Sequence, residues 1–130
     1  MAKSTSDSAE HAHVAGIHHL AIRADDVEAT AAFYRKIFGL VVVSDQRPRS
    51  LWLRLDARCV LMVEAREPGE PPVSDGSMDM FALAVDDETR KRILEYAAAA
   101  GCLDGQTEHT VYLRDPDGRR VGASSFPLDP

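Results

Sequence analysis

Two stretches of the chain share one pattern of hydrophobic and polar positions. Residues 19–26 read His-Leu-Ala-Ile-Arg-Ala-Asp-Asp, and residues 80–87 read Met-Phe-Ala-Leu-Ala-Val-Asp-Asp. Residues 51–54 (Leu-Trp-Leu-Arg) return in the same way as residues 111–114 (Val-Tyr-Leu-Arg). The offsets are 80 − 19 = 61 and 111 − 51 = 60, so two separate segments keep one spacing to within a residue. This regularity indicates an internal duplication.

The first repeat predicts one strand, one helix and three further strands. Alternating or β-branched residues favour strands over 17–24, 40–44, 51–55 and 59–65. Between the first two strands, Asp25 or Asp26 caps a helix, and Gly39 ends it. The apolar residues of that helix recur at helical spacing: Val27, Ala31, Tyr34, Ile37 and Phe38. The order of elements is therefore βαβββ.

The second repeat predicts the same order. A strand over 80–85 precedes a helix that Asp86 or Asp87 caps and Gly101 ends. A weak strand follows over 103–107, and two more strands flank the turn Asp-Pro-Asp-Gly at 115–118. Prolines and glycines make 66–77 a linker between module one (16–65) and module two (78–126). We expect residues 1–15 to form a flexible tail and 16–130 to form a single α+β domain.

Composition narrows the possible partners. The chain has 130 residues, a net charge of −6 and no basic run, which argues against nucleic acid. No apolar stretch approaches the roughly 20 residues that a membrane span requires, and the polar start lacks the apolar region of a signal peptide. We therefore expect a cytoplasmic protein with no membrane partner. Cys59 and Cys102 are predicted to be free thiols, since two cysteines give no disulfide framework.

Strand alternation assigns two faces to the sheet. One face is apolar and is expected to pack under the helices; it carries Leu20, Ile22, Leu51, Leu53, Leu55, Leu61, Val63, Phe81, Leu83, Val85, Val111, Leu113, Val121 and Ala123. The other face mixes aromatic, charged and small residues: His19, Ala21, Arg23, Trp52, Arg54, Met62, Glu64, Met80, Ala82, Ala84, Thr110, Tyr112, Arg114, Arg120, Gly122 and Ser124. Curling that face would give a concave pocket with aromatic walls, so it is the predicted binding surface. The alternative is a solvated outer face.

Several motifs resemble those of the vicinal oxygen chelate superfamily. They are Gly-Ile-His-His-Leu-Ala-Ile at 16–22, the Asp26 cap, Phe33-Tyr34, Phe38-Gly39-Leu40 and the turn at 115–118. This superfamily includes glyoxalase I, extradiol dioxygenases, and fosfomycin- and bleomycin-resistance proteins. The resemblance spans residues 15 to 126. It implies paired βαβββ modules that form a U-shaped mixed sheet with a concave cavity, and assembly as a homodimer.

The resemblance also implies where a metal would bind. Metal-dependent members take ligands from the first and fourth strands of each module, which places them here at His19, Met62, Met80 and Gly122. Only His19 suits Zn, Ni, Mn or Fe(II), and such a site requires at least three nitrogen or oxygen ligands. We therefore predict no metal cofactor. An alternative set of His19, Glu64 and Asp79 would need a bulge to turn Asp79 towards the other two residues.

These features favour a metal-free protein that binds a small molecule, similar to the drug-sequestering resistance proteins of the superfamily. Trp52 and Tyr112 would sandwich a planar ligand in a pocket lined by Met62, Met80 and Gly122. Arg54 and Arg114 could bind its anionic oxygens, unless an acid such as Glu64 or Glu108 neutralises them.

The sequence is also compatible with two alternative functions. One is an enzyme of the same superfamily, resembling a glyoxalase, a dioxygenase or a thiol transferase. It would use His19 as a general base, or a divalent metal held by the alternative ligands including Glu64. The other is a structural or regulatory dimer whose pocket is vestigial.

Overall fold

The first module folds as the sequence predicts. The computed structural model describes residues 12–129, so the first eleven residues of the expected tail lie outside it. Strand β1 is followed by helix α2 and by three further strands; the bounds are β1 His19–Ala24, α2 Val27–Phe38, β2 Val42–Gln46, β3 Ser50–Asp56 and β4 Cys59–Ala65. Asp26 is the residue that caps α2, because its carboxylate accepts a hydrogen bond from the backbone N–H of Ala29 at 3.1 Å.

The second module repeats this order. Its bounds are β5 Met80–Ala84, α3 Asp87–Ala100, β6 Leu103–Gln106, β7 Thr110–Arg114 and β8 Arg120–Ser124. Asp86 caps α3 through a 2.7 Å hydrogen bond from the backbone N–H of Thr89. Gly39 and Gly101 end the two helices in the left-handed conformation, which glycine adopts without steric cost. The weakly signalled strand before β7 is present as β6.

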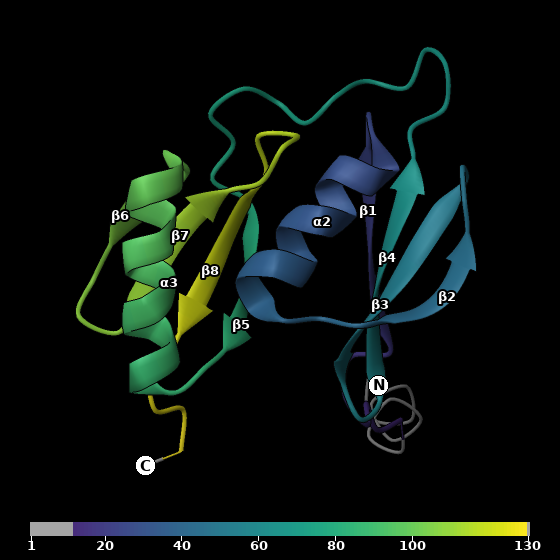
Figure 1. The fold of residues 1–130 in the computed structure, drawn as a ribbon. Coiled ribbons are helices and arrows are strands. Elements are labelled where there is room, and N and C mark those ends of the chain that lie inside the picture. Colours follow the sequence, from purple (N-terminus) through teal and green to yellow (C-terminus); the bar gives the residue numbers. More distant parts are fainter. Residues whose placement is uncertain (1–11, 130) are drawn as a thin grey trace, which may run out of the picture.

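The strands form two separate four-stranded mixed sheets of matching order, β1-β4-β3-β2 and β5-β8-β7-β6. β1 runs parallel to its neighbour β4, and β5 runs parallel to its neighbour β8. The other neighbouring strands are antiparallel. Figure 1 shows both helices on the same side, with α2 over the first sheet and α3 over the second. The α+β class and the paired βαβββ modules are thereby confirmed. The two sheets are not hydrogen-bonded into one continuous sheet within the described chain.

The core lies between the sheets and the helices. The apolar faces of β3, β4, β7 and β8 supply most of its completely buried side chains, including Leu53, Leu61, Leu113 and Val121. Helix α2 contributes Tyr34, whose ring stacks on Phe81 of the second module at a centroid distance of 6.2 Å. Because this one residue belongs to both module cores, the two modules share a single hydrophobic cluster.

A polar contact also joins the modules. Asp117, in the turn between β7 and β8, reaches helix α2: its carboxylate accepts a 2.6 Å hydrogen bond from the Thr30 hydroxyl and a 2.9 Å bond from the backbone N–H of Asp25. Arg66 lies 3.6 Å from the same carboxylate. The turn that the sequence marks as a hairpin therefore also fixes the position of one module against the other.

Within residues 12–129, neither helix is long and apolar enough to cross a membrane.

Candidate functional site

The outer faces of the two sheets carry equivalent side chains at equivalent places. Trp52 lies opposite Met62 in the β3–β4 pair, and Tyr112 lies opposite Gly122 in the β7–β8 pair. Arg54 and Arg114 each follow two residues later on the same strands. The register thus equates Trp52 with Tyr112 and Arg54 with Arg114, as the sequence repeat predicts.

Trp52 is the aromatic centre of the first outer face. It is half-buried between Ser44 of β2 and Met62 of β4, its register partners on either side. Its indole Nε1 is buried and has no hydrogen-bond partner among residues 12–129. A buried N–H without a partner costs about 1–3 kcal/mol, so this atom is a source of local destabilisation.

Tyr112 has a different environment on the second outer face. The guanidinium of Arg120 lies over its ring, 4.0 Å from the centroid, in a cation–π contact. One face of the tyrosine is therefore covered. No aromatic contact joins Trp52 to Tyr112 in the described part of the chain, so their sandwich arrangement stays a prediction.

Met80 and Gly122 form a closed apolar surface. A Cβ placed on Gly122 would lie 2.9 Å from the Met80 methyl and 3.1 Å from the Ala82 Cβ. These separations are shorter than van der Waals contact, so the Met80 thioether fills the space where a side chain at position 122 would project. The two implied ligand positions of the second module, 80 and 122, therefore carry a thioether and no side chain at all.

His19 and Glu64 do not come together. In the parallel β1–β4 pair, His19 lies opposite Val60 whereas Glu64 lies opposite Arg23. Four residues of strand separate them, roughly 13 Å at 3.3 Å per residue. Glu64 instead pairs with Arg23 at 3.7 Å. The ring nitrogen of His19 contacts His18, with an Nδ1–Nδ1 distance of 3.0 Å.

The alternative ligand set of His19, Glu64 and Asp79 is therefore not assembled. No group of three or more His, Cys, Asp or Glu side chains within residues 12–129 is placed to hold a metal ion. This set needed a bulge at Asp79 and a Glu64 side chain close to His19. The parallel register instead leaves His19 and Glu64 at opposite ends of the strand pair.

The two predicted arginines differ in their partners. Arg114 is held by Asp104, with its Nε 3.0 Å from the carboxylate, and donates to the carbonyl of Ser77 at 2.6 Å. Asp104 also accepts a 2.8 Å hydrogen bond from Arg120, and this bond, with the charges of both arginines, lowers the pKa of Asp104. Arg54 is exposed and takes part in no ion pair within the described residues. Of the two, Arg54 is the one available to a ligand.

A cavity of about 430 Å³ lies on the other side of the sheets, between the modules. Sequence reasoning missed it, because the strand residues Leu20, Leu55, Phe81 and Leu83 were all expected to pack under helices. They face the helix side as expected, but they are only partly buried. Alternation shows which face a residue occupies, whereas the gap between two modules depends on how the modules pack.

Comparison with known proteins identifies the family. The model of the Glyoxalase/Bleomycin resistance protein/Dioxygenase superfamily matches residues 16–122. The chain belongs to this superfamily. Its vicinal oxygen chelate fold is the one that the motifs of the sequence implied. No functionally curated protein matches the chain.

Solved structures show the same fold at low sequence identity. A possible glyoxalase from Bacillus cereus is 21% identical with a TM-score of 0.70, over 85% of this chain and 99% of that one. The fosfomycin resistance protein FosX from Mesorhizobium loti is 18% identical with a TM-score of 0.71, over 89% and 95%. Lactoylglutathione lyase from Agrobacterium tumefaciens is 23% identical with a TM-score of 0.63, over 87% and 95%.

The residues of this chain do not fit the metal of the superfamily. Of the four implied ligand positions, only His19 offers a nitrogen or oxygen donor. Met62 and Met80 offer thioether sulfur, which is a poor ligand for Zn, Mn or Fe(II), and Gly122 offers none. Met80 also fills the space above Gly122. No room is left there for a metal ligand from a neighbouring residue.

Proposed function

We propose that this protein binds a planar, aromatic, anionic small molecule on the outer face of its sheets without a metal ion. The observation that carries the proposal is the pair Met80 and Gly122, which replaces two ligand positions with a closed apolar surface. An apolar surface beside aromatic side chains favours stacking and burial over coordination. Members of the superfamily bind small molecules, and this chain keeps the fold while its donor set has changed.

Trp52 is the proposed stacking surface, since its indole is only half-buried on the outer face. Arg54, two residues along the same strand face, would pair with the negative charge. In this arrangement the first module recognises the ligand, and Met80, which covers the buried Gly122, supplies further apolar area together with Tyr112.

A fluorescence titration tests the proposal. Trp52 is the only tryptophan of the chain, so its emission reports on its own surroundings. A panel of aromatic carboxylates and phenols is titrated, and at least one compound is expected to quench the emission. By calorimetry, Trp52→Ala should weaken that compound by about 1–3 kcal/mol, since stacking and burial are both lost. Arg54→Gln should weaken the anion but leave its uncharged ester unchanged.

Arg35→Gln is the matched control, because Arg35 is exposed on α2 away from the sheet face. It removes the same charge and should leave affinity unchanged. Equal losses from Arg54→Gln and Arg35→Gln would mean that only net charge matters. A panel that leaves Trp52 emission unchanged, together with measurable turnover of a thiol adduct or a catechol, would contradict the binding proposal and favour an enzyme.

A further inference from the structure

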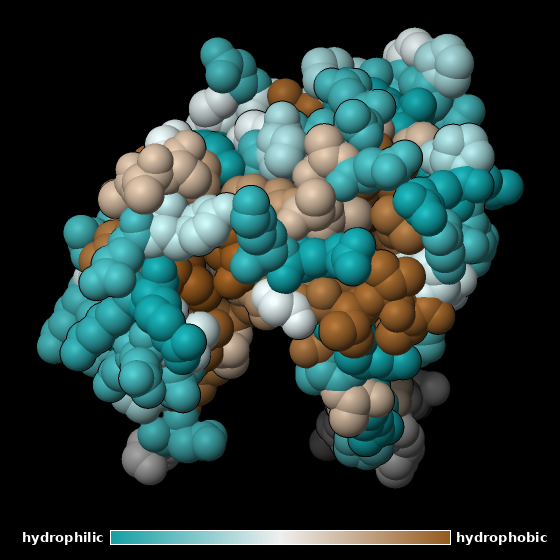
Figure 2. Space-filling view, in the orientation of Figure 1, coloured by the Kyte–Doolittle hydropathy of each residue, from teal (hydrophilic) through white to brown (hydrophobic). Residues whose placement is uncertain are grey.

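The cleft between the modules is a second cavity that the sheet-face proposal does not use. Figure 2 shows it as a notch between the two halves of the molecule, with hydrophobic residues on its walls. Its volume of about 430 Å³ falls within the range of small-molecule sites. One wall comes from β5 and the other from the beginning of β1, the end of α2 and the turn between β3 and β4.

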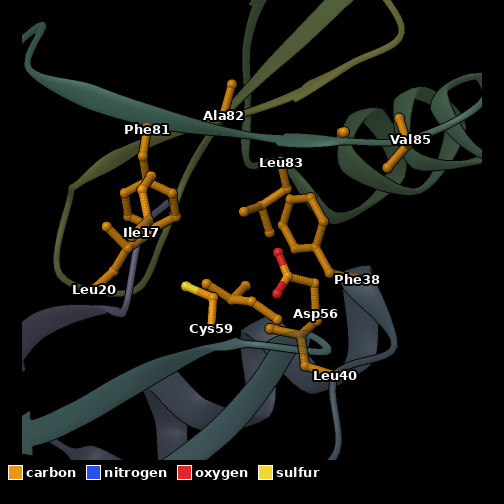
Figure 3. Close-up of a pocket in the computed structure, with 12 residues that line it drawn as sticks. Ile17, Leu20, Phe38, Leu40, Asp56, Cys59, Phe81, Ala82, Leu83 and Val85 are labelled. Atoms are coloured by element: carbon orange, nitrogen blue, oxygen red, sulfur yellow. The ribbon is translucent and has the colours of Figure 1, made fainter. Parts of the chain in front are cut away.

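Two aromatic rings and several aliphatic side chains form these walls. Figure 3 shows Phe38 and Phe81 directed into the cavity from opposite modules, with Leu20, Leu40 and Leu83 around them. Each of these five side chains is only partly buried, so each retains apolar surface that a ligand could cover. At about 25 cal/mol per Å², removing this surface from water favours an apolar guest.

Asp56 is the single charged residue among those that line the cavity, and Figure 3 shows its carboxylate directed inwards. Oxygen Oδ1 accepts a 2.8 Å hydrogen bond from the backbone N–H of Arg58, as is usual in a tight turn. Asp56 takes part in no ion pair within residues 12–129. Its second oxygen therefore faces the cavity without a cation.

The thiol of Cys59 also lines the cavity, and it acts as part of the apolar wall. Desolvation raises the pKa of Cys59, and the nearby charge of Asp56 raises it further. A thiol with a raised pKa stays neutral at physiological pH and is a weak nucleophile. Recognition in this cavity therefore depends on burial and on the single negative charge of Asp56.

We propose that this inter-module cleft binds an organic cation with a small apolar body, such as an arylalkyl ammonium. The apolar body would lie between Phe38 and Phe81, and the ammonium group would donate to the free oxygen of Asp56. Trp52, Met62 and Arg54 do not line this cavity, so the site is distinct from the sheet face. The two sites would take ligands of opposite charge.

The test compares three probes of similar shape: phenethylammonium, uncharged 2-phenylethanol and anionic 3-phenylpropionate. Each is titrated into the ¹⁵N-labelled protein, and amide shifts of Leu83 and Cys59 report on the cleft. Phenethylammonium should bind most tightly and 3-phenylpropionate most weakly. Asp56→Asn should weaken phenethylammonium about twofold to fivefold, the range for an ion pair with an exposed carboxylate. The affinity of 2-phenylethanol should not change.

Two further variants keep the test specific. Asp75→Asn removes the same charge from the linker outside the cavity and should change none of the affinities. Leu83→Trp places a larger side chain in the cavity and should abolish binding of both phenethylammonium and 2-phenylethanol. Equal affinity in Asp56→Asn and the unmodified protein would overturn the proposal, as would shifts at Trp52 and Met62 in place of the cleft. Self-association that protects the cleft amides and excludes phenethylammonium would overturn it too, since the cleft would then be an interface between copies.

Discussion

The hydroxyl of Tyr34 donates a 2.8 Å hydrogen bond to the carboxylate of Asp115, a residue 81 positions away in the other module. Both residues are buried. The same carboxylate accepts bonds from the backbone N–H groups of Asp117 and Arg119, and from the Arg119 guanidinium at 2.7 Å. Tyr34 thus links helix α2 to a carboxylate whose remaining donors all belong to the second module.

Replacing Tyr34 with Phe should destabilise the protein. The change removes one donor from a buried carboxylate and leaves the ring stacking on Phe81 in place. A hydrogen bond to a charged group contributes about 1.5–3 kcal/mol, so the free energy of unfolding should fall by that amount. Urea unfolding followed by circular dichroism measures it. Tyr96→Phe on α3, where the ring is exposed, is the control and should change stability little.

The same contact predicts a dependence on alkaline pH. Burial raises the pKa of Tyr34 well above its usual value of 10.0, and the negative charge of Asp115 raises it further. The unfolded chain therefore loses this proton as the pH passes about 10, whereas the folded chain keeps it. The contribution is fully present below pH 10 and is lost as the pH rises above it.

The difference between the unmodified protein and Tyr34→Phe isolates this contribution from the other groups that titrate there. Unfolding midpoints measured between pH 8 and 11 should fall more steeply above pH 10 in the unmodified protein than in the variant. The excess slope is limited to about 1.4 kcal/mol per pH unit for a single proton. Parallel curves for the two proteins would show that Tyr34 titrates alike in the folded and unfolded states.

Local patterns predicted most of the fold, because each element carries its own signals. Asp26 and Gly39 bound one helix, and Asp86 and Gly101 bound the other, as cap chemistry requires. The repeat offset predicted the equivalence of Trp52 and Tyr112. The bond between Tyr34 and Asp115 could not be predicted in this way, since neither residue carries a local signal for a partner 81 residues away.

Gly122 provides a prediction about packing on the outer face. In Gly122→Ala the new Cβ would crowd the Met80 methyl and the Ala82 Cβ, so the free energy of unfolding should fall by about 1–3 kcal/mol. Met80→Ala removes the flexible neighbour. The double variant should therefore lose less stability than the sum of the single variants. Additive losses in urea unfolding would mean that Met80 does not fill the space above position 122.

The candidate site was less predictable than the fold. The sequence located the four implied ligand positions by repeat and motif, but side-chain partners depend on tertiary contacts. Arg54 and Arg114 are equivalent in the repeat, yet Asp104 neutralises only Arg114, because β6 brings that carboxylate beside β7. Arg120 covers Tyr112 but has no counterpart over Trp52, since Val60 occupies the equivalent position in the first module.

Metal content is the measurement that most directly separates the two functional classes. Protein purified without chelator and without an affinity tag should contain far less than one Zn, Ni, Mn or Fe per chain by elemental analysis. The reason is the donor set, since Met62, Met80 and Gly122 cannot complete a site around His19. The His19→Ala variant should show the same low content, and His13→Ala controls for metal held near the N-terminus. A full equivalent of metal that is lost in His19→Ala and kept in His13→Ala would contradict the metal-free proposal.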